Sequence, residues 1–330
     1  MAYDRPWKSY PEQLEILKSR GLGCSDEAKV ISYLQRLGYY RLSGYWYPFR
    51  EIKLEQDVTT RKLKYKRLDN FVENAQFKDA VQLYVYDKKL RLLAMDALER
   101  IEVAVRCDIA YLLGERDTFA YRSPEQFDTR FSQVGDGHER SRHQEWLDKF
   151  EVSLDRSKEE FVKHYKEKYG LPLPIWVAIE TWDFGLLSTL YAGMKYKDKE
   201  AVAAKFGIST PKVFESWLRS LNYLRNICAH HSRLWNRNVV DQPKLPDVGE
   251  VPGLEEFRGK HDLIARPFLL FCIMRHLLEK ICPNSHWHVR FKQLASEFPT
   301  VGTGGISAND MGLIEGWRDW SMWEDDIEGK

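Results

Sequence analysis

The residue types best suited to chemistry in this sequence lie within six consecutive positions, Arg225-Asn226-Ile227-Cys228-Ala229-His230. An arginine and a histidine separated by four residues form the pattern R-x4-H. A histidine that titrates near neutral pH can take a proton from a ribose 2′-hydroxyl or give one to a leaving oxygen. An arginine can hold a phosphate through two hydrogen bonds and stabilise the charge that develops on it. The pair therefore suits phosphate chemistry on RNA that needs no metal and no cofactor, although the pattern by itself is common by chance.

The segment that carries this pattern is expected to be one helix from Pro211 to Arg237, begun by a proline in its first turn. Its opposite face is apolar and suits a core. One helical face collects, within about 80° of Asn222, a stripe of polar side chains: Arg219, Asn226, His230, Arg233 and Arg237. Because this face holds no acid from 219 to 237, it favours an anion such as phosphate. An ordinary solvated helix face is the alternative.

Two questions about the pattern stay open at the level of sequence. On an ideal helix Arg225 lies about 140° from His230, so either the helix distorts near Cys228 or the long arginine reaches round. His231 also creates an overlapping R-x5-H pattern. We favour His230 as the acid or base because it shares a face with Asn226.

Composition limits the classes of protein to consider. The chain has 330 residues, of which 43% are hydrophobic and 13% aromatic, enough for a core and incompatible with global disorder. No run of about 18 apolar residues is present, so no membrane span is expected. The N-terminus lacks an apolar signal core, and the five scattered cysteines fit a reducing compartment better than a disulfide framework. We therefore expect a cytoplasmic protein without a membrane partner.

Helical periodicity dominates the sequence around the pattern. From Phe77 to Gly114 apolar residues recur at steps of mostly three and four, which predicts one helix of about 35 residues or two with a break near Asp87. Convincing strands are few, so the predicted fold class is all-α, a helical bundle. Further helices are expected over residues 139–168, 175–194 and 262–282.

Three segments are expected along the chain. Residues 1–70 would form N-terminal helices and a basic segment packed on the core, residues 71–240 a helical core, and residues 241–330 a loop with C-terminal helices. Together they are expected to make one compact unit.

The net charge of +1 hides a polarised chain. Residues 34–67 carry nine basic and three acidic side chains, whereas the stretch from Asp310 carries seven acids against two basic residues. Aromatic residues at 39–40 and 45–47 could stack on bases, or could pack the N-terminal helices onto the bundle, which is the plainer interpretation. The candidate RNA contacts in this segment are Arg36, Arg41, Arg50, Lys62 and Lys64.

Two further clusters can be interpreted either as part of the folded core or as part of a chemical site. A cysteine and histidine group matches no familiar zinc module, so core cysteines and helix-end histidines explain it better, and no metal site is expected. A charged group on the long helix is either a buried ionic network, which we favour, or a support for the catalytic arginine. The first group is Cys272, His276, Cys282, His286 and His288. The second is Glu99, Arg100, Glu102 and Arg106.

Several stretches together resemble the Abi-like family, the AbiD/AbiF-type abortive-infection proteins of bacteria. The longest is Leu224-Arg225-Asn226-Ile227-Cys228-Ala229-His230-His231-Ser232-Arg233-Leu234-Trp235-Asn236-Arg237. An N-terminal pattern is similar too, with Pro11-Glu12-Gln13-Leu14, Lys18-Ser19-Arg20-Gly21-Leu22 and Leu37-Gly38-Tyr39-Tyr40-Arg41-Leu42-Ser43-Gly44-Tyr45-Trp46-Tyr47-Pro48-Phe49. So are residues 98–106 and a tail with Met311-Gly312-Leu313, Trp317 and Trp323. The resemblance covers about residues 10 to 323.

The resemblance implies a helical bundle of HEPN type, with additional N- and C-terminal helices, that carries the R-x4-6-H ribonuclease motif. It implies metal-independent RNA cleavage in phage defence that leaves a 2′,3′-cyclic phosphate. Arg225 would bind phosphate, His230 would be the acid or base, and Asn226 would orient the histidine or the RNA. The supporting residues would be His231, Arg233, Asn222, Arg219 and Glu102.

The resemblance also implies partners. HEPN sites usually pair two motifs face to face, and one R-x4-H occurs here in a matching context, so a homodimer is the natural completion. RNA would be the substrate or a guide. Whether an antitoxin, a regulatory small RNA or a phage component controls the activity stays open. Two rival functions stay open: a non-catalytic RNA-binding or regulatory protein that uses the polar stripe for phosphate contacts, and a structural dimer whose stripe is only an interface.

Overall fold

The computed structural model describes residues 6–56, 63–303 and 305–324. Helices form most of this part of the chain, and the one sheet within it has two strands, β1 and β2. The predicted all-α fold class is therefore confirmed. None of the described helices combines the length and the apolar character that crossing a membrane would need.

The described chain divides into two compact units. Of the described residues, unit 1 comprises 6–56, 63–91, 233–236, 293–303 and 305–311, and unit 2 comprises 92–232, 237–292 and 312–324. The three segments expected from the sequence stay a prediction.

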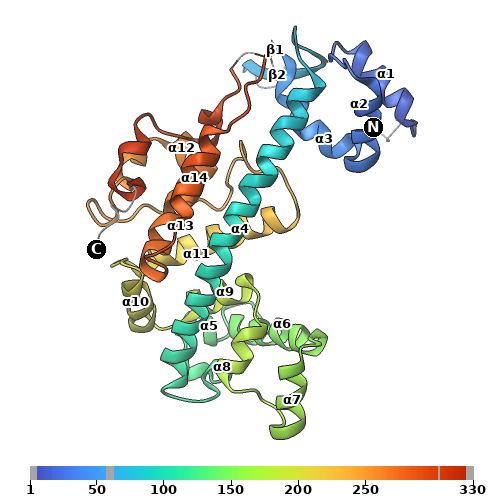
Figure 1. Cartoon of the computed structure of the whole chain (residues 1–330). Coiled ribbons are helices and arrows are strands. Elements are labelled where there is room, and N and C mark those ends of the chain that lie inside the picture. Colours follow the sequence, from blue (N-terminus) through green and yellow to red (C-terminus); the bar gives the residue numbers. More distant parts are fainter. Residues whose placement is uncertain (1–5, 57–62, 304, 325–330) are drawn as a thin grey trace. The chain divides into compact units, whose positions relative to one another are not determined.

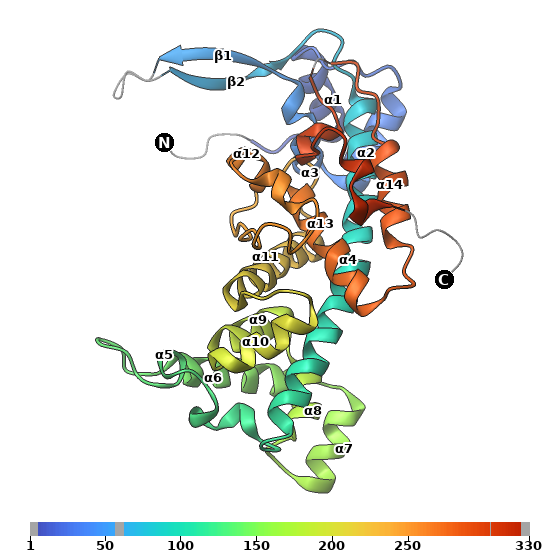
Figure 2. The ribbon, with the colours of Figure 1, turned by 90° about the vertical axis from the view of Figure 1, so that its left-hand side faces the viewer.

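Unit 1 contains three short helices and a hairpin before the long helix. The helices are α1 (Tyr10–Ser19), α2 (Glu27–Leu37) and α3 (Tyr39–Trp46). The strands are β1 (Arg50–Gln56) and β2 (Leu63–Phe71), which pair antiparallel and are seen side by side in Figure 2. The described part of the basic segment, residues 34–67, thus covers the end of α2, helix α3 and most of this hairpin. Trp46 and Phe49 are fully buried and anchor its base in the core of the unit.

Helix α4 (Phe77–Gly114) is a single helix of 38 residues, drawn without interruption in Figure 1. The alternative of one long helix is confirmed, and the break near Asp87 does not occur. Its buried positions, such as Leu90, Ala94 and Leu98, repeat every four residues, as the apolar periodicity predicts. Residues up to Arg91 belong to unit 1 and the remainder to unit 2.

Unit 2 holds most of the remaining helices. They are α5 (Thr129–Ser132), α6 (Arg142–Arg156), α7 (Glu160–Tyr169), α8 (Ile175–Ala178), α9 (Phe184–Gly193), α10 (Tyr196–Lys205), α11 (Pro211–Ala229), α12 (His261–Ile264) and α13 (Pro267–Ile281). Helix α14 (Trp287–Ser296) begins in this unit. Short 3-10 helices cover Tyr47–Phe49, Ala120–Arg122, Pro124–Gln126, Ile179–Thr181, Leu254–Phe257, Ala308–Met311, Trp317–Asp319 and Ser321–Trp323.

Aromatic side chains fill the core of unit 2. Trp146 and Trp182 meet edge to face with ring centroids 4.9 Å apart, and Tyr121 and Phe150 pack around them. Such aromatic pairs contribute beyond the area they bury. This cluster fixes α6 against the segment that leads into α9, which prepares the pocket described below.

Several predicted helices are broken where polar groups interrupt the pattern. The helix expected over 139–168 is two helices, α6 and α7, and the helix expected over 175–194 is interrupted before α9. The second break follows from Asp183, whose side chain accepts a hydrogen bond from the Leu186 N–H at 2.7 Å and caps α9. A side chain that caps a new helix stops the preceding one, because the cap residue itself is extended.

Candidate functional site

Helix α11 presents the polar stripe expected from the sequence over part of its length. Pro211 occupies its first turn, and Phe214, Trp217 and Leu221 are fully buried on the opposite face. The helix ends at Ala229, so the prediction that it runs to Arg237 is wrong. Arg219, Asn222 and Asn226 therefore share a helix face, whereas Arg233 and Arg237 lie beyond the helix.

The helix ends in a Schellman motif centred on the two histidines. His230 is the C-cap, and His231 follows with φ of 55°, in the left-handed region. The His231 N–H donates to the Cys228 carbonyl at 3.0 Å, and the Ser232 N–H donates to the Ile227 carbonyl at 3.0 Å. These two bonds satisfy carbonyls that the helix end would leave unpaired. The usual sequence signal for this turn is glycine, which is absent here, so the sequence continued the helix too far.

Arg225 and Asn226 lie together in the last turns of α11. The half-buried Arg225 donates from Nη1 to the Oδ1 atom of Asn226 at 3.1 Å. The structure thus joins the two residues by a side-chain hydrogen bond. His230 is exposed one turn later, and its N–H donates to the Asn226 carbonyl at 2.9 Å. The three predicted catalytic residues are therefore contiguous at one helix end.

Helix α4 supplies a carboxylate whose charge interacts with that of Arg225. Burial raises the pKa of Glu102, as does the nearby Asp183 carboxylate, while the charges of Arg106 and Arg225 oppose the rise. Glu102 forms an ion pair with Arg106, and the two side chains are only 13% and 15% exposed. Arg106 also donates to the Trp182 carbonyl. The ion pair between Glu102 and Arg106 agrees with the ionic network that we favoured, and the support of Arg225 by Glu102 stays a prediction.

The other members of that charged group lie elsewhere. Arg100 pairs with Asp96 at 2.5 Å and donates to the Ser285 hydroxyl at 2.7 Å. Glu99 is exposed. The four residues that the sequence grouped therefore do not form one network. Glu102 pairs with Arg106, whereas Arg100 has other partners and Glu99 is exposed.

Arg219 and Asn222 line a pocket on unit 2. Gly185, near the start of α9, lies beside Asn222. A Cβ added to Gly185 would stand 3.1 Å from the Asp183 Oδ1 atom and 3.7 Å from the Asn222 Nδ2 atom. Arg219 Nε lies 3.7 Å from the Asp241 Oδ1 atom. The first half of the polar stripe therefore faces a hollow rather than a flat solvated surface.

The two remaining arginines of the predicted stripe serve different contacts. Arg237 donates from Nε to the Tyr223 hydroxyl at 2.9 Å, within unit 2. Arg233 belongs to unit 1, where it donates to the Gly44 carbonyl. Placing either on the helix face of Asn222 was wrong, because the chain turns after Ala229.

The candidate RNA contacts of the basic segment lie in unit 1. Arg36 and Arg41 are exposed on α2 and α3, and Lys64 is exposed on β2. Arg50 pairs with Asp69 at 3.1 Å. Lys62 lies outside the described residues.

The described residues contain no group of three or more His, Cys, Asp or Glu side chains that could hold a metal ion. Within the former zinc candidate, Cys272 is fully buried in α13, and His276 Nε2 bonds the Phe206 carbonyl at 2.8 Å. Burial lowers the pKa of His276.

Comparison with known proteins places the chain in a family. A family model of Abi-like proteins matches residues 32–236, more than half of the 330 residues. The chain belongs to the Abi-like family. Membership points to a role in abortive infection. Searches of curated proteins and of solved structures found no significant match.

The matched range of this Abi-like protein contains the whole R-x4-H segment and ends at Asn236. The likeness read from the sequence was longer, and its parts at residues 10–22 and 311–323 lie outside that range. The matched range thus holds Glu102, Asp183 and the three predicted catalytic residues.

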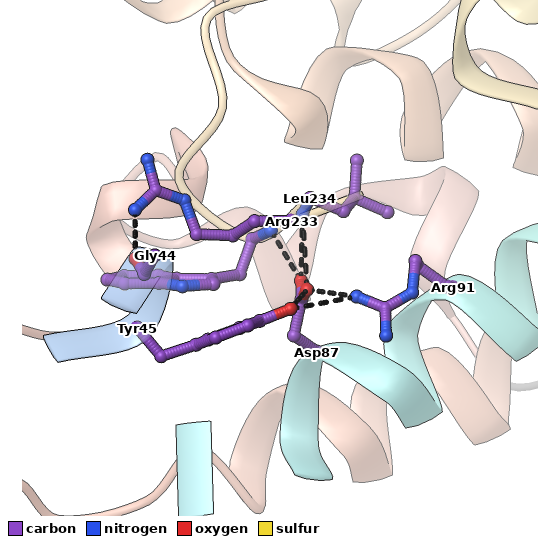
Figure 3. Close-up of polar contacts among 7 residues, drawn as sticks. Gly44, Tyr45, Asp87, Arg91, Arg233 and Leu234 are labelled. Atoms are coloured by element: carbon purple, nitrogen blue, oxygen red, sulfur yellow. Dashed lines mark hydrogen bonds and ion pairs between the residues drawn. The ribbon is translucent and has the colours of Figure 1, made fainter. Parts of the chain in front are cut away.

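A buried network in unit 1 explains the last residues of the match, and sequence reasoning missed it. Asp87 of α4 is fully buried and accepts hydrogen bonds from the backbone N–H groups of Leu234, at 3.0 Å, and Trp235, at 2.7 Å. The Tyr45 hydroxyl donates to the same carboxylate at 2.7 Å, and Arg91 pairs with it, as Figure 3 shows. Burial and the Asp87 charge raise the pKa of Tyr45, which keeps the phenol protonated as a donor.

This network gives the Leu234-Trp235 part of the Abi-like signature a structural role. A buried carboxylate needs several donors, and here two come from the backbone of the signature itself. The one signal in the sequence was an aspartate four residues before an arginine on an apolar helix, which is the spacing of Asp87 and Arg91.

Proposed function

We propose that this Abi-like protein is a metal-independent endoribonuclease of HEPN type that acts as the effector of an abortive-infection system. In this proposal Arg225, Asn226 and His230 cleave RNA and leave a 2′,3′-cyclic phosphate. The observation that carries the proposal is the arrangement at the end of α11. A half-buried arginine that is hydrogen-bonded to an amide is followed, five residues later, by an exposed histidine.

The arginine is suited to phosphate because its surroundings restrict it without removing it from solvent. Its Nη1 donates to Asn226, and its charge interacts with that of Glu102 on α4. A guanidinium has five N–H donors, so one bond to Asn226 leaves most of them for two phosphate oxygens. An oriented donor of this kind typically contributes about 10²–10³ in rate.

The proposed reaction is a transesterification within the RNA. An imidazole of His230 takes the proton of the ribose 2′-hydroxyl, and the 2′-oxygen attacks the neighbouring phosphorus. The bond from phosphorus to the 5′-oxygen of the next nucleotide breaks, and that oxygen receives a proton from an imidazolium. Arg225 stabilises the negative charge that gathers on the phosphate oxygens. The products are a 2′,3′-cyclic phosphate and a 5′-hydroxyl.

We propose a homodimer as the active form. The reaction needs one base and one acid, and each chain contributes one His230. Two chains related by a two-fold axis supply two such histidines to one site. A measurement of molar mass by light scattering tests this, and a protein that cleaves RNA as a monomer contradicts it. An antitoxin or a small RNA as regulator belongs to the same proposal.

The decisive experiment compares four proteins on total RNA and structured RNAs in EDTA. They are the wild type, Arg225→Ala, His230→Ala and the control His164→Ala, which removes an exposed histidine of α7. We expect cleavage by the wild type and the control, with cyclic phosphate ends, and a loss of at least about 10² in rate for the other two.

Each alternative outcome has a definite meaning. Equal cleavage by all four proteins places the activity elsewhere or in a contaminant. Cleavage that EDTA abolishes contradicts a metal-independent mechanism. Salt-dependent RNA binding that survives His230→Ala, together with no cleavage by the wild type, favours the non-catalytic RNA-binding protein.

A further inference from the structure

A pocket of about 800 Å³ opens on unit 2 between α6, α9 and α11. Helices α9 and α11 pack side by side in both ribbon views, and α6 packs on α9. Two bonds hold α6 in place: the Trp146 indole donates to the Leu186 carbonyl at 2.9 Å, and the Ser153 hydroxyl donates to the Thr181 carbonyl at 3.3 Å. The walls of the pocket are therefore the faces of three helices that pack on one another.

One wall carries a row of positive charge. Arg142, Lys149 and Arg156 line the pocket and are all exposed. Their spacing of seven residues puts them on one face of α6, about 10.5 Å apart along its axis. Within the described part of the chain, no carboxylate lies within 4.0 Å of any of these three cationic groups.

Most of the acids of α6 pair with cations outside this row. Three of them pair with cations that come from outside the helix. Asp148 pairs with Arg140, Glu151 with Arg122 at 3.0 Å, and Asp155 with Lys166 at 3.8 Å. Glu145 is the α6 acid that lines the pocket itself.

The acids on the facing walls are already engaged. Glu215 of α11 pairs with Lys199 at 3.2 Å, and Asp183 caps α9 through the Leu186 N–H. Arg219 and Asn222 of α11 add a further cation and an amide to the same pocket. Four cations and three carboxylates line the pocket, a net charge of +1, and three of the cations form the row on α6, which suits a chain of phosphates.

The pocket offers no ring on which a base could stack. Among its lining residues Trp146 is the one aromatic, and it is 2% exposed, with its indole N–H already bound. Proteins that recognise bases in single strands use exposed aromatic faces. Contacts here would go to phosphate and ribose, which position a strand without reading its sequence.

We propose that this pocket holds the phosphate backbone of single-stranded RNA, with Arg142, Lys149 and Arg156 as the phosphate contacts. The proposal rests on the proposed ribonuclease function and extends it to the class of substrate. Asn222 lies one helical turn before Asn226, so a strand in the pocket leads toward the Arg225 end of α11. A hollow of this size admits a few nucleotides of a single strand, and an A-form duplex is recognised across a much wider surface.

The test measures RNA binding as a function of salt. All proteins carry His230→Ala so that the probe stays intact, and the probe is a fluorescein-labelled oligouridylate of about 12 nucleotides in EDTA. The pocket variant is Arg142→Ala with Lys149→Ala and Arg156→Ala. The control removes three exposed lysines of unit 2 that do not line the pocket, through Lys158→Ala, Lys163→Ala and Lys197→Ala. Both triple variants change the net charge equally.

Three lost phosphate contacts predict a definite change. A single strand gives a slope of about −0.7 per contact in log K against log salt, so the pocket variant should lose about 2.1 units of slope. Between about 50 and 200 mM salt, the affinity of the parent should then fall about 18-fold more than that of the pocket variant. The control variant should bind the probe within a factor of about 2 of the parent. Both variants should keep the melting temperature of the parent because the substituted side chains are exposed.

The outcomes separate this inference from the proposed function. Equal slopes for the pocket variant and the control overturn the strand path, even if the wild type cleaves RNA. A duplex of equal length that binds as tightly, with the same dependence on the pocket, overturns the preference for single strands. A wild type that never cleaves, with a slope that still depends on the pocket, overturns the nuclease and supports the pocket as an RNA site.

Discussion

Replacing Asp87 with alanine should destabilise unit 1 severely. The carboxylate is 0% exposed and binds Arg91, the Tyr45 hydroxyl and the backbone N–H groups of Leu234 and Trp235. Alanine would leave a guanidinium that is 6% exposed without its counter-charge, and two buried N–H groups without an acceptor. No water can replace the carboxylate easily in so closed a site.

The magnitude follows from these losses. Removing one partner of a buried ion pair typically costs about 3–5 kcal/mol, and an orphaned buried N–H costs about 1–3 kcal/mol. The cost of the broken ion pair and the cost of the orphaned N–H groups do not simply add, because the backbone can relax. We therefore expect a loss of about 4–5 kcal/mol in the free energy of unfolding, a large share of the roughly 5–15 kcal/mol that typical domains possess.

The assay is urea unfolding followed by tryptophan fluorescence, combined with hydrogen exchange of the Leu234 and Trp235 amides. Two controls calibrate it. Tyr45→Phe removes one hydroxyl from the network and should cost about 0.5–1.5 kcal/mol. Asp69→Ala makes the same substitution at an ion pair whose carboxylate is 54% exposed, and it should cost less than about 1 kcal/mol.

A double variant distinguishes a lost charge balance from a lost side chain. Asp87→Leu with Arg91→Met removes both charges and keeps the volume, so it should recover part of the stability that Asp87→Ala loses. The reasoning is refuted if Asp87→Ala costs no more than Asp69→Ala, or if the amides of Leu234 and Trp235 keep their protection from exchange in the alanine variant.

Three further predictions concern single positions. His231→Gly should raise stability by up to about 1 kcal/mol, because φ is 55° there, and should keep RNA cleavage; a loss of cleavage would make His231 the acid or base. Gly193→Ala should cost about 1–3 kcal/mol in thermal unfolding, because the added Cβ would stand 2.3 Å from the ring of Phe131, and a neutral result would contradict this packing. Burial lowers the pKa of His143 and His276 below the ordinary 6.5, so unfolding takes up protons, and stability should be full above about pH 6.5 and decrease as the pH falls below it. Urea midpoints at several pH values test this, and a double Gln variant that keeps the same pH dependence would refute it.

The all-α class, the long helix α4 and the polar stripe of α11 could be predicted from the sequence. The reason is that these features are local. A helix that packs on a core must repeat its apolar residues every three or four positions, and 77–114 does so without proline or an internal glycine. The R-x4-H pattern and the family likeness are also properties of neighbouring residues, so they needed no structure to be recognised.

The positions at which the helices end depended on the residues that cap them. The capping aspartate at 183 is visible in the sequence, yet the apolar residues on both sides of it predicted one continuous helix. At the end of α11 the left-handed residue is His231 in place of the usual glycine. Histidine tolerates that conformation, but its presence does not predict it, because its cost depends on the bonds that Ser232 and His231 make to the preceding turn.

Only the tertiary structure decided which distant residues meet. Glu102 comes within electrostatic range of Arg225 across more than a hundred positions, and Asp87 finds its donors at Leu234 and Trp235. The sequence offered Glu102 as one of two alternatives, and the spacing of Asp87 and Arg91 was its one signal of the second contact. The physical reason is that periodicity reports which face of an element is buried, whereas the partner of a buried charge is chosen by the packing of whole elements.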